Sequence, residues 1–414
     1  MMRSMVAAIS GLKNHQTMMD VVGNNIANVN TTGFKQSRVS FQDILSQTVR
    51  GASGPQGGRG GVNPEQVGLG VVLGGIDTIQ SQGTLQSTGK STDMAIQGDG
   101  YFVINDGKQD YFTRDGSFDL GTDGTLVNPS SGMHVMGWQA NPTTGLVDTT
   151  VPPTVLTVPI GGGMTGKIST SLTVTGNLDS NNVGGAAVGV PVILSTTVYD
   201  AQGNALPVTL TATRSVAVPP SQTWTVVATG SGASGTTTVQ FSPAGKVISP
   251  AGGLGTITLT VATGATTPQS VQLDLSQITQ LAGSSSMSSN TDGASAGSLT
   301  SFTVGKAGDI TGIYSNGYKQ PLGQMALGSF ANPGGLVKAG GNLFAASPNS
   351  GTASIGTPST SGRGDIATGF LEGSNVDLAQ QFTNMIMAER GFQANSKVIT
   401  TSDEILQDLV NLKH

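Results

Sequence analysis

The sequence contains no cysteine, which excludes a disulfide framework and any thiolate metal site. Charged residues are scarce, at 10% of the 414 residues, against about 25% in ordinary soluble proteins. Aromatic residues make up only 5%, so few large side chains are available to fill a core. We therefore expect thin cores, many turns and a fold in which β-structure predominates.

Long hydrophobic runs are also missing. No segment approaches the ~20 apolar residues that a membrane-spanning helix requires, so we expect no membrane insertion. The apolar start at Met5–Ile9 is too short for a secretory signal, and Ser10 and Gly11 interrupt it. The formal net charge is −5 and the basic residues form no stripe, so we expect no nucleic-acid partner.

Residue patterns for catalysis are absent as well. The three histidines, His15, His134 and His414, do not have the spacing of metal ligands. Gly89-Lys90-Ser91 resembles part of a phosphate-binding loop, but Gly83 stands one position too early for that motif. We interpret it as a polar turn. The sequence therefore predicts no enzyme, with no catalytic residues, no cofactor and no metal site.

The strongest pattern present is apolar spacing at both ends of the chain. Steps of three and four residues predict one helix over about Ser4–Asn28 and another over about Val376–Leu412. Such steps are typical of a coiled-coil seam. The first seam comprises Met5, Ile9, Leu12, Met19 and Ile26, and the second comprises Met385, Ala388, Phe392, Asn395, Ile399, Ser402, Leu406 and Leu409.

Two interpretations of these helices are open. They pack on the protein's own core, as most amphipathic helices do, or they pack between subunits. Their terminal position, their heptad spacing and the glycine-rich sequence beside them favour packing between subunits. Ser374 and Asp377 predict a capping-box-like start of the second helix.

The middle of the chain reads as β-structure. Val151–Gly305 carries only seven charged residues and contains alternating runs. These predict strands at Val192–Tyr199, Pro207–Thr213 and Thr256–Val261, with Trp224 as a core residue. Earlier strands are predicted at Met94–Ile96 and Tyr101–Ile104, with a hairpin turn at Asp115-Gly116. We interpret Gly51–Gly61 as a flexible connection and Ser284–Ser298 as a loop.

This order predicts a nested architecture. The expected fold class is mixed but mainly β, with nested discontinuous β-domains and with N- and C-terminal α-helices that form a coiled-coil-like inner domain. Residues 1–30 and 375–414 are the helical inner domain, and 31–75 and 360–374 are connecting segments. A first β-domain is expected over 76–150 and 298–359, and 151–297 is an inserted outer β-domain.

Several motifs, in one order, carry a family resemblance. The chain resembles the bacterial flagellar rod and hook proteins, over about both outer thirds of its length. At the start the matching segments are Ser10-Gly11-Leu12, Asn24–Asn28 and Thr32-Gly33-Phe34-Lys35. Between the ends they are Asn63-Pro64, Val67–Gly70, Asp93–Phe102, Thr113–Phe118 and Ile313–Gly317. At the finish they are Leu371–Asp377, Met385-Ile386, Arg390 and Asn395.

The resemblance implies a structural subunit. Its large insertion favours a hook subunit, which self-assembles into a curved tube that joins rod to filament and transmits torque. The alternatives are a distal rod subunit or, in a different class, a secreted β-rich adhesin or carbohydrate-binding protein. The implied partners are other copies of the chain, the rod, the hook cap, the hook–filament junction proteins and the flagellar type III export apparatus. The implied location is the flagellar hook, outside the cell.

The resemblance also assigns roles to particular residues. It implies that Asn24, Asn25 and Asn28 lie in packed inner layers, where their amides bond between subunits, although asparagines here also suit a simple helix stop. Phe41 and Leu45 resemble an export-gate motif, an aromatic residue four positions before an apolar one. The alternative for this pair is ordinary packing of a short apolar segment.

Overall fold

The computed structural model describes residues 2–55, 58, 60–141, 144–164, 166–182, 190–215, 222–230, 232–259 and 269–411. It divides into two compact units. The first comprises Met1–Val158, Thr303–Thr311 and Pro321–His414, and the second comprises Pro159–Phe302 and Gly312–Gln320. The second unit thus begins at 159 instead of the expected 151, and it takes in a further short segment. The finer domain boundaries given above stay predictions.

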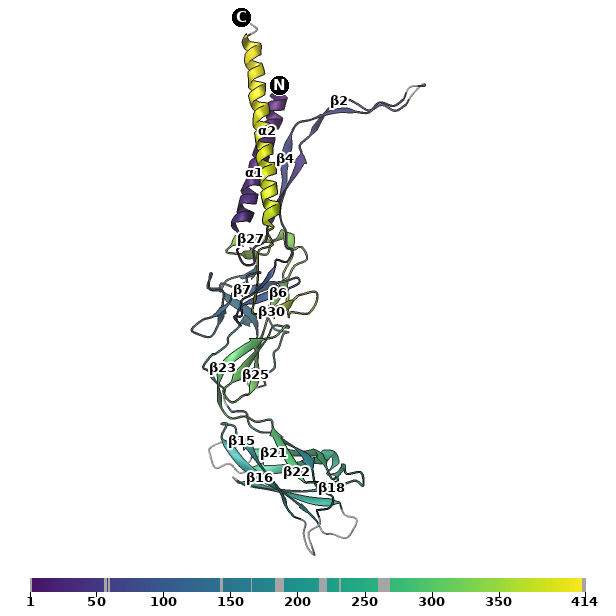
Figure 1. Ribbon diagram of the computed structural model, residues 1–414, viewed down its shortest axis with the longest axis vertical. Helices are drawn as coiled ribbons and strands as arrows, with labels where there is room; N and C mark the ends of the chain where they lie inside the picture. The colour runs from purple at the N-terminus through teal and green to yellow at the C-terminus, as the bar shows by residue number, and fades with distance from the viewer. Residues whose placement is uncertain are drawn as a thin grey trace. The chain divides into compact units, whose positions relative to one another are not determined.

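Two helices begin and end the described chain. Helix α1 (Met2–Ala27) and helix α2 (Leu378–Asn411) lie side by side and antiparallel (Figure 1). The cap of α2 is Asp377, whose Oδ1 accepts the N–H groups of Ala379 (2.9 Å) and Gln380 (3.2 Å). The predicted box with Ser374 is wrong, since Asp377 itself occupies the cap position.

A long two-stranded ribbon follows α1. Strand β1 (Ser37–Asp43) pairs antiparallel with β4 (Val71–Thr78), and β2 (Ser46–Arg50) pairs antiparallel with β3 (Glu65–Gly68). Residues 31–75, which we expected to be a connecting segment, therefore contain four strands. Glycines do not prevent this, because a two-stranded ribbon needs only backbone pairing and a turn.

The β-domain of the first unit combines strands from both halves of the chain. β6 (Met94–Gln97) pairs with β30 (Asp365–Thr368), and β5 (Leu85–Ser87) pairs with β31 (Phe370–Glu372). Its other strands are β7 (Tyr101–Asn105), β8 (Asp110–Thr113), β9 (Asp119–Leu120), β10 (Leu126–Val127), β11 (His134–Gln139), β12 (Thr154–Val155), β26 (Leu327–Ser329), β27 (Val337–Gly340), β28 (Leu343–Ala345) and β29 (Ser354–Gly356). The pairing across the insertion confirms the nested order.

One core cluster of this β-domain is rich in aromatic side chains. Tyr101, Phe112, Trp138 and Phe344 pack with Val103 in one buried cluster. The hairpin between β7 and β8 turns at residues 106–109, where Gly107 has a φ of +88°. The predicted turn at Asp115-Gly116 is therefore wrong. That pair follows β8, and the Gly116 carbonyl accepts the N–H of Met94 at 3.0 Å.

The second unit is a sheet that curls on itself. Its strand order is β15 (Val192–Tyr199), β16 (Ala205–Arg214), β17 (Thr223–Gly230), β18 (Ala233–Phe241), β20 (Leu254–Leu259), β21 (Gln269–Thr279), β14 (Ser171–Asn177) and β22 (Ser286–Thr291). Ser289 of β22 donates to Thr196 of β15 at 2.8 Å, which brings the two ends of this order together.

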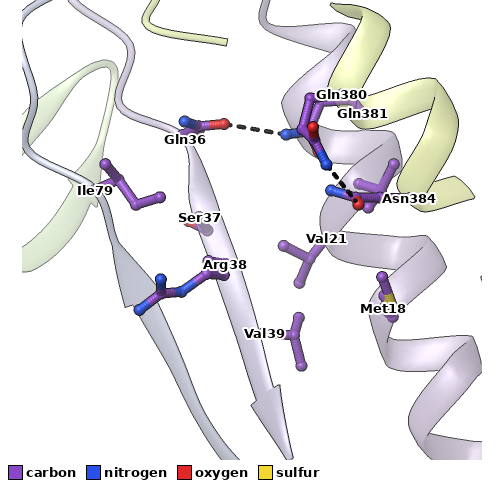
Figure 2. A pocket seen from close by; sticks show the side chains of 11 residues that line it. Met18, Val21, Gln36, Ser37, Arg38, Val39, Ile79, Gln380, Gln381 and Asn384 are labelled. Carbon is purple, nitrogen blue, oxygen red and sulfur yellow. Dashed lines mark hydrogen bonds between the residues drawn. The ribbon is translucent and has the colours of Figure 1, made fainter. Parts of the chain in front are cut away.

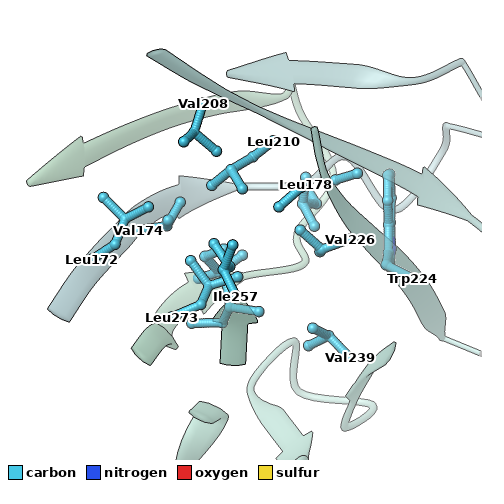
Figure 3. Packing of buried hydrophobic residues seen from close by; sticks show 14 of the residues in the cluster. Leu172, Val174, Leu178, Val208, Leu210, Trp224, Val226, Val239, Ile257 and Leu273 are labelled. Atoms are coloured by element: carbon cyan, nitrogen blue, oxygen red, sulfur yellow. The ribbon is translucent and has the colours of Figure 1, made fainter. Parts of the chain in front are cut away.

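Apolar side chains of the second unit pack together in one buried cluster, of which Trp224, 0% exposed, is a member (Figure 3). The predicted strand Val192–Tyr199, its return strand and the core role of Trp224 are confirmed. The predicted loop at Ser284–Ser298 is wrong, because β22 lies within it. Its small Ser and Thr side chains alternate half-buried and exposed along an antiparallel partner, β14.

The remaining strands and short helices complete the list of elements. They are β13 (Gly163–Met164), β19 (Val247–Ser249), β23 (Gly297–Val304), β24 (Asp309–Tyr314), β25 (Lys319–Met325) and the short 3-10 helices Ala251–Gly253 and Pro333–Gly335.

Candidate assembly interface

The two helices approach each other closely at two glycines. A Cβ atom on Gly11 of α1 would lie 2.8 Å from Nδ2 of Asn395 on α2. A Cβ atom on Gly391 of α2 would collide with the ring of His15 on α1. Both glycines are therefore fixed by packing, because no larger side chain fits between the helices at this distance. The two ends of the chain meet each other within one molecule.

The predicted seam residues lie on or beside this contact. Ala388 and Ser402 of α2 are buried. Of the others, Met5, Leu12, Met19, Ile26, Met385, Phe392, Asn395, Ile399 and Leu406 are half-buried. Ile9 and Leu409 stay 53% and 49% exposed. On α1 the buried positions are Ala8, Gly11, Asn14, Val22 and Asn25, and three of them (Ala8, Gly11 and Asn25) come one residue before a residue of the predicted seam. The role of the seam in packing between subunits stays a prediction.

Large apolar side chains remain in solvent on the helix pair. On α1 they recur at steps of four and three residues and lie along one face. On α2 they form two groups on different faces, Leu378–Ile386 at steps of four and Val398–Leu409 at steps of seven and four. We call them the helix-pair apolar surface, and they are 40% to 76% exposed: Met2, Val6, Ile9, Leu378, Phe382, Ile386, Val398, Ile405 and Leu409. Apolar area on this scale is rare on a protein that works as a monomer, and it marks an interaction surface.

The ribbon is also apolar and exposed. Every residue of β2 and β3 is exposed, and Leu45, Val49 and Val67 are among them or next to them. A two-stranded hairpin is at best marginally stable in water without a packing partner. The β1–β4 part of the ribbon is tied to α1, where Nδ2 of Asn14 donates to the Val71 carbonyl at 2.9 Å and the Val71 N–H donates to Oγ of Ser10 at 3.2 Å. The outer ribbon thus needs a cover that the described chain does not supply.

The export-gate pair lies in this ribbon. Phe41 belongs to β1 and is 37% exposed, and Leu45 follows β1 and is 68% exposed. Both side chains are accessible to a partner even in the folded chain. Their role in export stays a prediction.

The asparagines at the end of α1 do separate tasks. Asn25 is buried, and its side-chain amide exchanges two hydrogen bonds with the backbone of Ser37, at 2.8 and 2.9 Å, as a neighbouring strand would. It also donates to Gln381 of α2 at 3.2 Å. Asn28 donates to the carbonyl of Asn24 at 2.9 Å, which satisfies one free carbonyl at the helix end. The helix-stop interpretation therefore accounts for Asn28.

Asn375 repeats this arrangement at the start of the C-terminal segment. Its Oδ1 accepts the N–H of Gln36 at 2.8 Å, and its Nδ2 donates to the carbonyls of Ile79 and Ser81 at 2.9 and 3.1 Å. One amide thus holds the N-terminal chain, the ribbon and the C-terminal chain together at the base of the helix pair.

A buried ion cluster completes this junction. Glu372 has a fully buried side chain that binds Nζ of Lys35 at 2.7 Å and Nη1 of Arg114 at 3.2 Å, with Lys35 and Arg114 only 1% and 4% exposed. Its Oε1 also accepts the N–H of Gly83 at 2.9 Å. The Arg114 guanidinium lies over the ring of Tyr101, 5.3 Å from its centroid. Burial lowers the pKa of Lys35, against the opposing attraction of Glu372, and burial raises the pKa of Tyr101 to about 12.

The sequence motifs contained these three charged residues, but sequence reasoning did not bring them together. The one sequence signal that could have pointed to a buried cluster is the presence of charged residues in these motifs. Lys35, Arg114 and Glu372 stand in apolar or small-residue motifs of a chain with only 10% charged residues. A charge in such a setting has to be paired if it is buried.

The described residues contain no group of three or more His, Asp or Glu side chains arranged to hold a metal ion. Neither helix of the described chain is long and apolar enough to cross a membrane.

Four family models match successive parts of the chain. They describe a flagellar basal body rod protein over 5–35 and a flagellar hook protein D1 domain over 95–170. A flagellar basal body protein D2 domain matches 193–294, and the C-terminal region of flagellar basal body rod proteins matches 367–412. The two terminal models contain the helices whose contact is described above.

Full-length relatives decide the family. The flagellar hook protein of Borreliella burgdorferi is 43% identical, and that of Treponema pallidum is 40% identical, each over 100% of both chains. The chain belongs to the flagellar hook protein family. It is therefore a structural component of the bacterial flagellum and lies outside the enzyme families. The flagellar basal-body rod protein of Bacillus subtilis is also similar, at 34% identity over 100% of both chains, below the identity of the two hook proteins just given.

A solved structure supports the fold. The flagellar hook protein of Helicobacter pylori matches with a TM-score of 0.54 at 16% identity, and the match covers 69% of this chain and 100% of that one. The expected fold class, mainly β with helices from the two chain ends, is confirmed.

Proposed function

We propose that this hook-family chain polymerises through its helix-pair apolar surface into a curved tube that transmits torque between rod and filament. The observation that carries the proposal is the exposure of that surface. Apolar stripes run along helices whose mutual contact is already complete, so the stripes are left for other copies of the chain. Burying one such side chain is worth about 1.5–3 kcal/mol.

The ribbon supplies a second contact in this proposal. In its β2–β3 part each strand has a free edge with unpaired backbone groups, and every residue of these two strands is exposed in the described chain. Packed between neighbouring subunits, the ribbon gains the apolar cover that it lacks alone. Phe41 and Leu45 are then read by the type III export apparatus before assembly and become part of this contact afterwards.

The wider partners follow from the same surfaces. A tube whose subunits share one repeating contact has two unlike ends, and each end leaves that contact unfilled. The rod would complete one end, and the hook cap and later the hook–filament junction proteins would complete the other. The final location is the hook, after export through the flagellar channel.

Electron microscopy of the purified full chain tests assembly directly. We expect curved tubes at raised protein concentration, and the protein should stay monomeric at low concentration because the helix contacts are not covalent. A chain that stays monomeric at every soluble concentration, in light scattering and in micrographs, would overturn the proposal.

The second unit has a different proposed role, which is to set curvature. Gly163 and Ser298 are antiparallel strand partners, so the chain enters and leaves this part of the unit about 5 Å apart. Replacing the residues between them with a short Gly/Ser linker should leave tubes that still form but are straighter. Normally curved tubes from that variant would show that the second unit does not set the curvature.

A further inference from the structure

Side-chain hydrogen bonds join separate elements at two places in the chain. At the base of the helix pair, Gln381 of α2 donates to Gln36, just before β1, at 3.0 Å (Figure 2). The same side chain accepts from Asn25 of α1 at 3.2 Å, beside a helix contact that packing already holds. In the second unit, by contrast, a hydroxyl bond joins two strands that have no backbone pairing with each other.

These two strands are β15 and β22, which stand at the two ends of the strand order of the nine-stranded sheet. Neighbours in that order are joined by backbone hydrogen bonds, but β15 and β22, both fully described, are not paired with each other. The hydroxyl of Ser289 donates to that of Thr196 at 2.8 Å between them. We call this line the β15–β22 junction. In the described chain, each of its strands keeps one backbone edge without a strand partner.

One end of the junction is fastened by buried polar groups. Ser169, fully buried just before β14, donates its N–H to the Tyr199 carbonyl at 2.9 Å and accepts the Tyr199 N–H on its hydroxyl at 2.8 Å. The same hydroxyl bonds to that of Thr291 at 2.9 Å. Nε2 of Gln269 donates to the carbonyls of Ser169 and Tyr199 at 2.9 and 3.1 Å. Ser169 and Gln269, which we call the clasp, thus tie the end of β15 to the end of β22.

The other end of the junction is held by side chains alone. Val192 and Leu194 of β15 and Met287 of β22 pack against the buried cluster of the second unit but are themselves only half-buried. Separating them exposes less additional apolar area than separating core residues, so it costs less free energy. The junction therefore has a strong end at the clasp and a weak end at Met287.

We propose that the sheet of the second unit opens along the β15–β22 junction while the rest of the unit stays folded. The clasp is the hinge, and the Ser289–Thr196 hydroxyl bond is the latch. Opening breaks the latch and the contacts of half-buried side chains but no backbone pairing, so its free energy lies well below that of global unfolding. The unit can then widen without losing its sheet. This motion belongs to the single chain and does not rest on the proposed assembly.

Hydrogen exchange, followed by mass spectrometry on the full chain, tests the opening. The test variant carries Thr196→Cys and Ser289→Cys, so that a disulfide locks the junction, and the natural chain has no cysteine that would compete. Under reductant, we expect β15 and β22 to exchange within a time in which β17 stays protected. Oxidation should slow the exchange of β15 and β22 toward that of β17.

A matched control places the same disulfide across paired strands. The hydroxyls of Thr175 and Ser288 also lie 2.8 Å apart, but they belong to β14 and β22, which are paired with Thr175 opposite Ser288. Oxidation of Thr175→Cys with Ser288→Cys should leave the exchange of β15 unchanged, because this lock does not cross the β15–β22 junction.

A latch variant covers the case in which the cysteine pair does not fold or oxidise. Ser289→Ala should speed the exchange of β15 and β22 by about two- to tenfold, the factor that corresponds to one net hydrogen bond. Ser288→Ala, which removes a hydroxyl bond beside intact backbone pairing, should leave β15 as it was.

The outcomes are distinct. If β15 and β22 exchange only together with β17, the unit opens only by unfolding and the proposal is overturned. Equal exchange of β15 in the oxidised and the reduced test variant also overturns it, because these amides then exchange without any separation of the strands. Slower exchange of β15 on oxidation of the control pair overturns it as well, because any disulfide would then have the same effect.

Discussion

The second unit and the helix pair handle their apolar residues in opposite ways. In the second unit the strand order closes through Ser289 and Thr196, and the large side chains pack in one buried cluster with Trp224. In the helix pair, small residues such as Gly11, Ala388 and Gly391 occupy the contact, and residues as large as Phe382 face solvent. The first arrangement is complete in one molecule, whereas the second is completed by other copies of the chain in the proposed assembly.

This difference separates stability from assembly along the chain. A change in the second unit should affect unfolding without affecting polymerisation, and a change on the exposed helix faces should do the reverse. Four predictions test that separation, from the largest expected effect to the smallest.

Ile386→Asp should abolish assembly. Ile386 is 57% exposed on the helix-pair apolar surface, so the free chain tolerates the change, but a charge buried between subunits costs several kcal/mol. We expect the critical concentration for tube formation to rise at least about a hundredfold, since 2.8 kcal/mol corresponds to that factor. Thr383→Asp is the matched control, because Thr383 is exposed on the same helix and already bonds to the Ala379 carbonyl. Normal tubes from Ile386→Asp would contradict the assignment.

Trp224→Ala should destabilise the second unit by about 3–5 kcal/mol, because Trp224 is fully buried and its loss leaves a large cavity. Thermal unfolding followed by tryptophan-independent far-ultraviolet circular dichroism measures this. Ile193→Ala, at a position 64% exposed on the same unit, should change stability by less than about 0.5 kcal/mol. A loss of helix contacts in assembled Trp224→Ala protein would show that the two regions are not separate.

Glu372→Gln should destabilise the first unit by about 3 kcal/mol, because removing one partner of a buried ion cluster leaves Lys35 and Arg114 without a carboxylate. Asp119→Asn is the comparison. Asp119 pairs with Lys90 at 3.3 Å in solvent, and an exposed pair contributes at most about 1 kcal/mol. Denaturant unfolding of both variants measures the contrast, and equal losses would contradict the importance of burial.

Acid should weaken the second unit through Asp292. Burial acts to raise the pKa of this carboxyl, but hydrogen bonds from the Thr170 hydroxyl and from the N–H groups of Ser171 and Thr170 outweigh it, so the pKa is lowered. A carboxyl with a lowered folded pKa stabilises above its unfolded pKa, about 3.9, and this stability is lost as pH falls through the folded value. Asp292→Asn should flatten the acid limb of a Tm–pH profile slightly. An unchanged profile would contradict this role.

Apolar residues at every second position predicted the long strands, and apolar residues at steps of three and four predicted the helices. Each pattern arises because one face of the element is buried and the opposite face is in water. Val192–Tyr199 and both terminal helices are the clearest cases. The ribbon and β22 were missed because both faces of their strands are polar or exposed, so no alternating apolar pattern marks them. Backbone pairing with the neighbouring strand is what forms them. On α1, three of the buried positions lie one residue before the predicted seam because small residues make the contact, and an apolar pattern follows large ones.

The candidate site was predicted in part. The terminal seams and the asparagines were placed on the two helices that meet, and their role between subunits stays a prediction. The exposed residues of the helix-pair apolar surface were not separated from the seam. That separation depends on where the partner helix lies, which spacing alone does not give. The meeting of Lys35, Arg114 and Glu372 was beyond sequence reasoning, since it depends on contacts between distant parts of the chain.

The Glu372 cluster has a consequence for the timing of folding. Lys35 and Glu372 are separated by 337 positions. The strands β30 and β31, which precede α2, pair with β6 and β5 in the first quarter of the chain. Contacts this distant form late, because closing long loops costs entropy before it is repaid. In a chain that emerges amino-terminus first, Lys35 and Arg114 therefore have no carboxylate partner until Glu372, close to the last tenth of the chain, has emerged. A truncated chain keeps them unpaired, so incomplete subunits carry a built-in defect at the point where the helix pair begins.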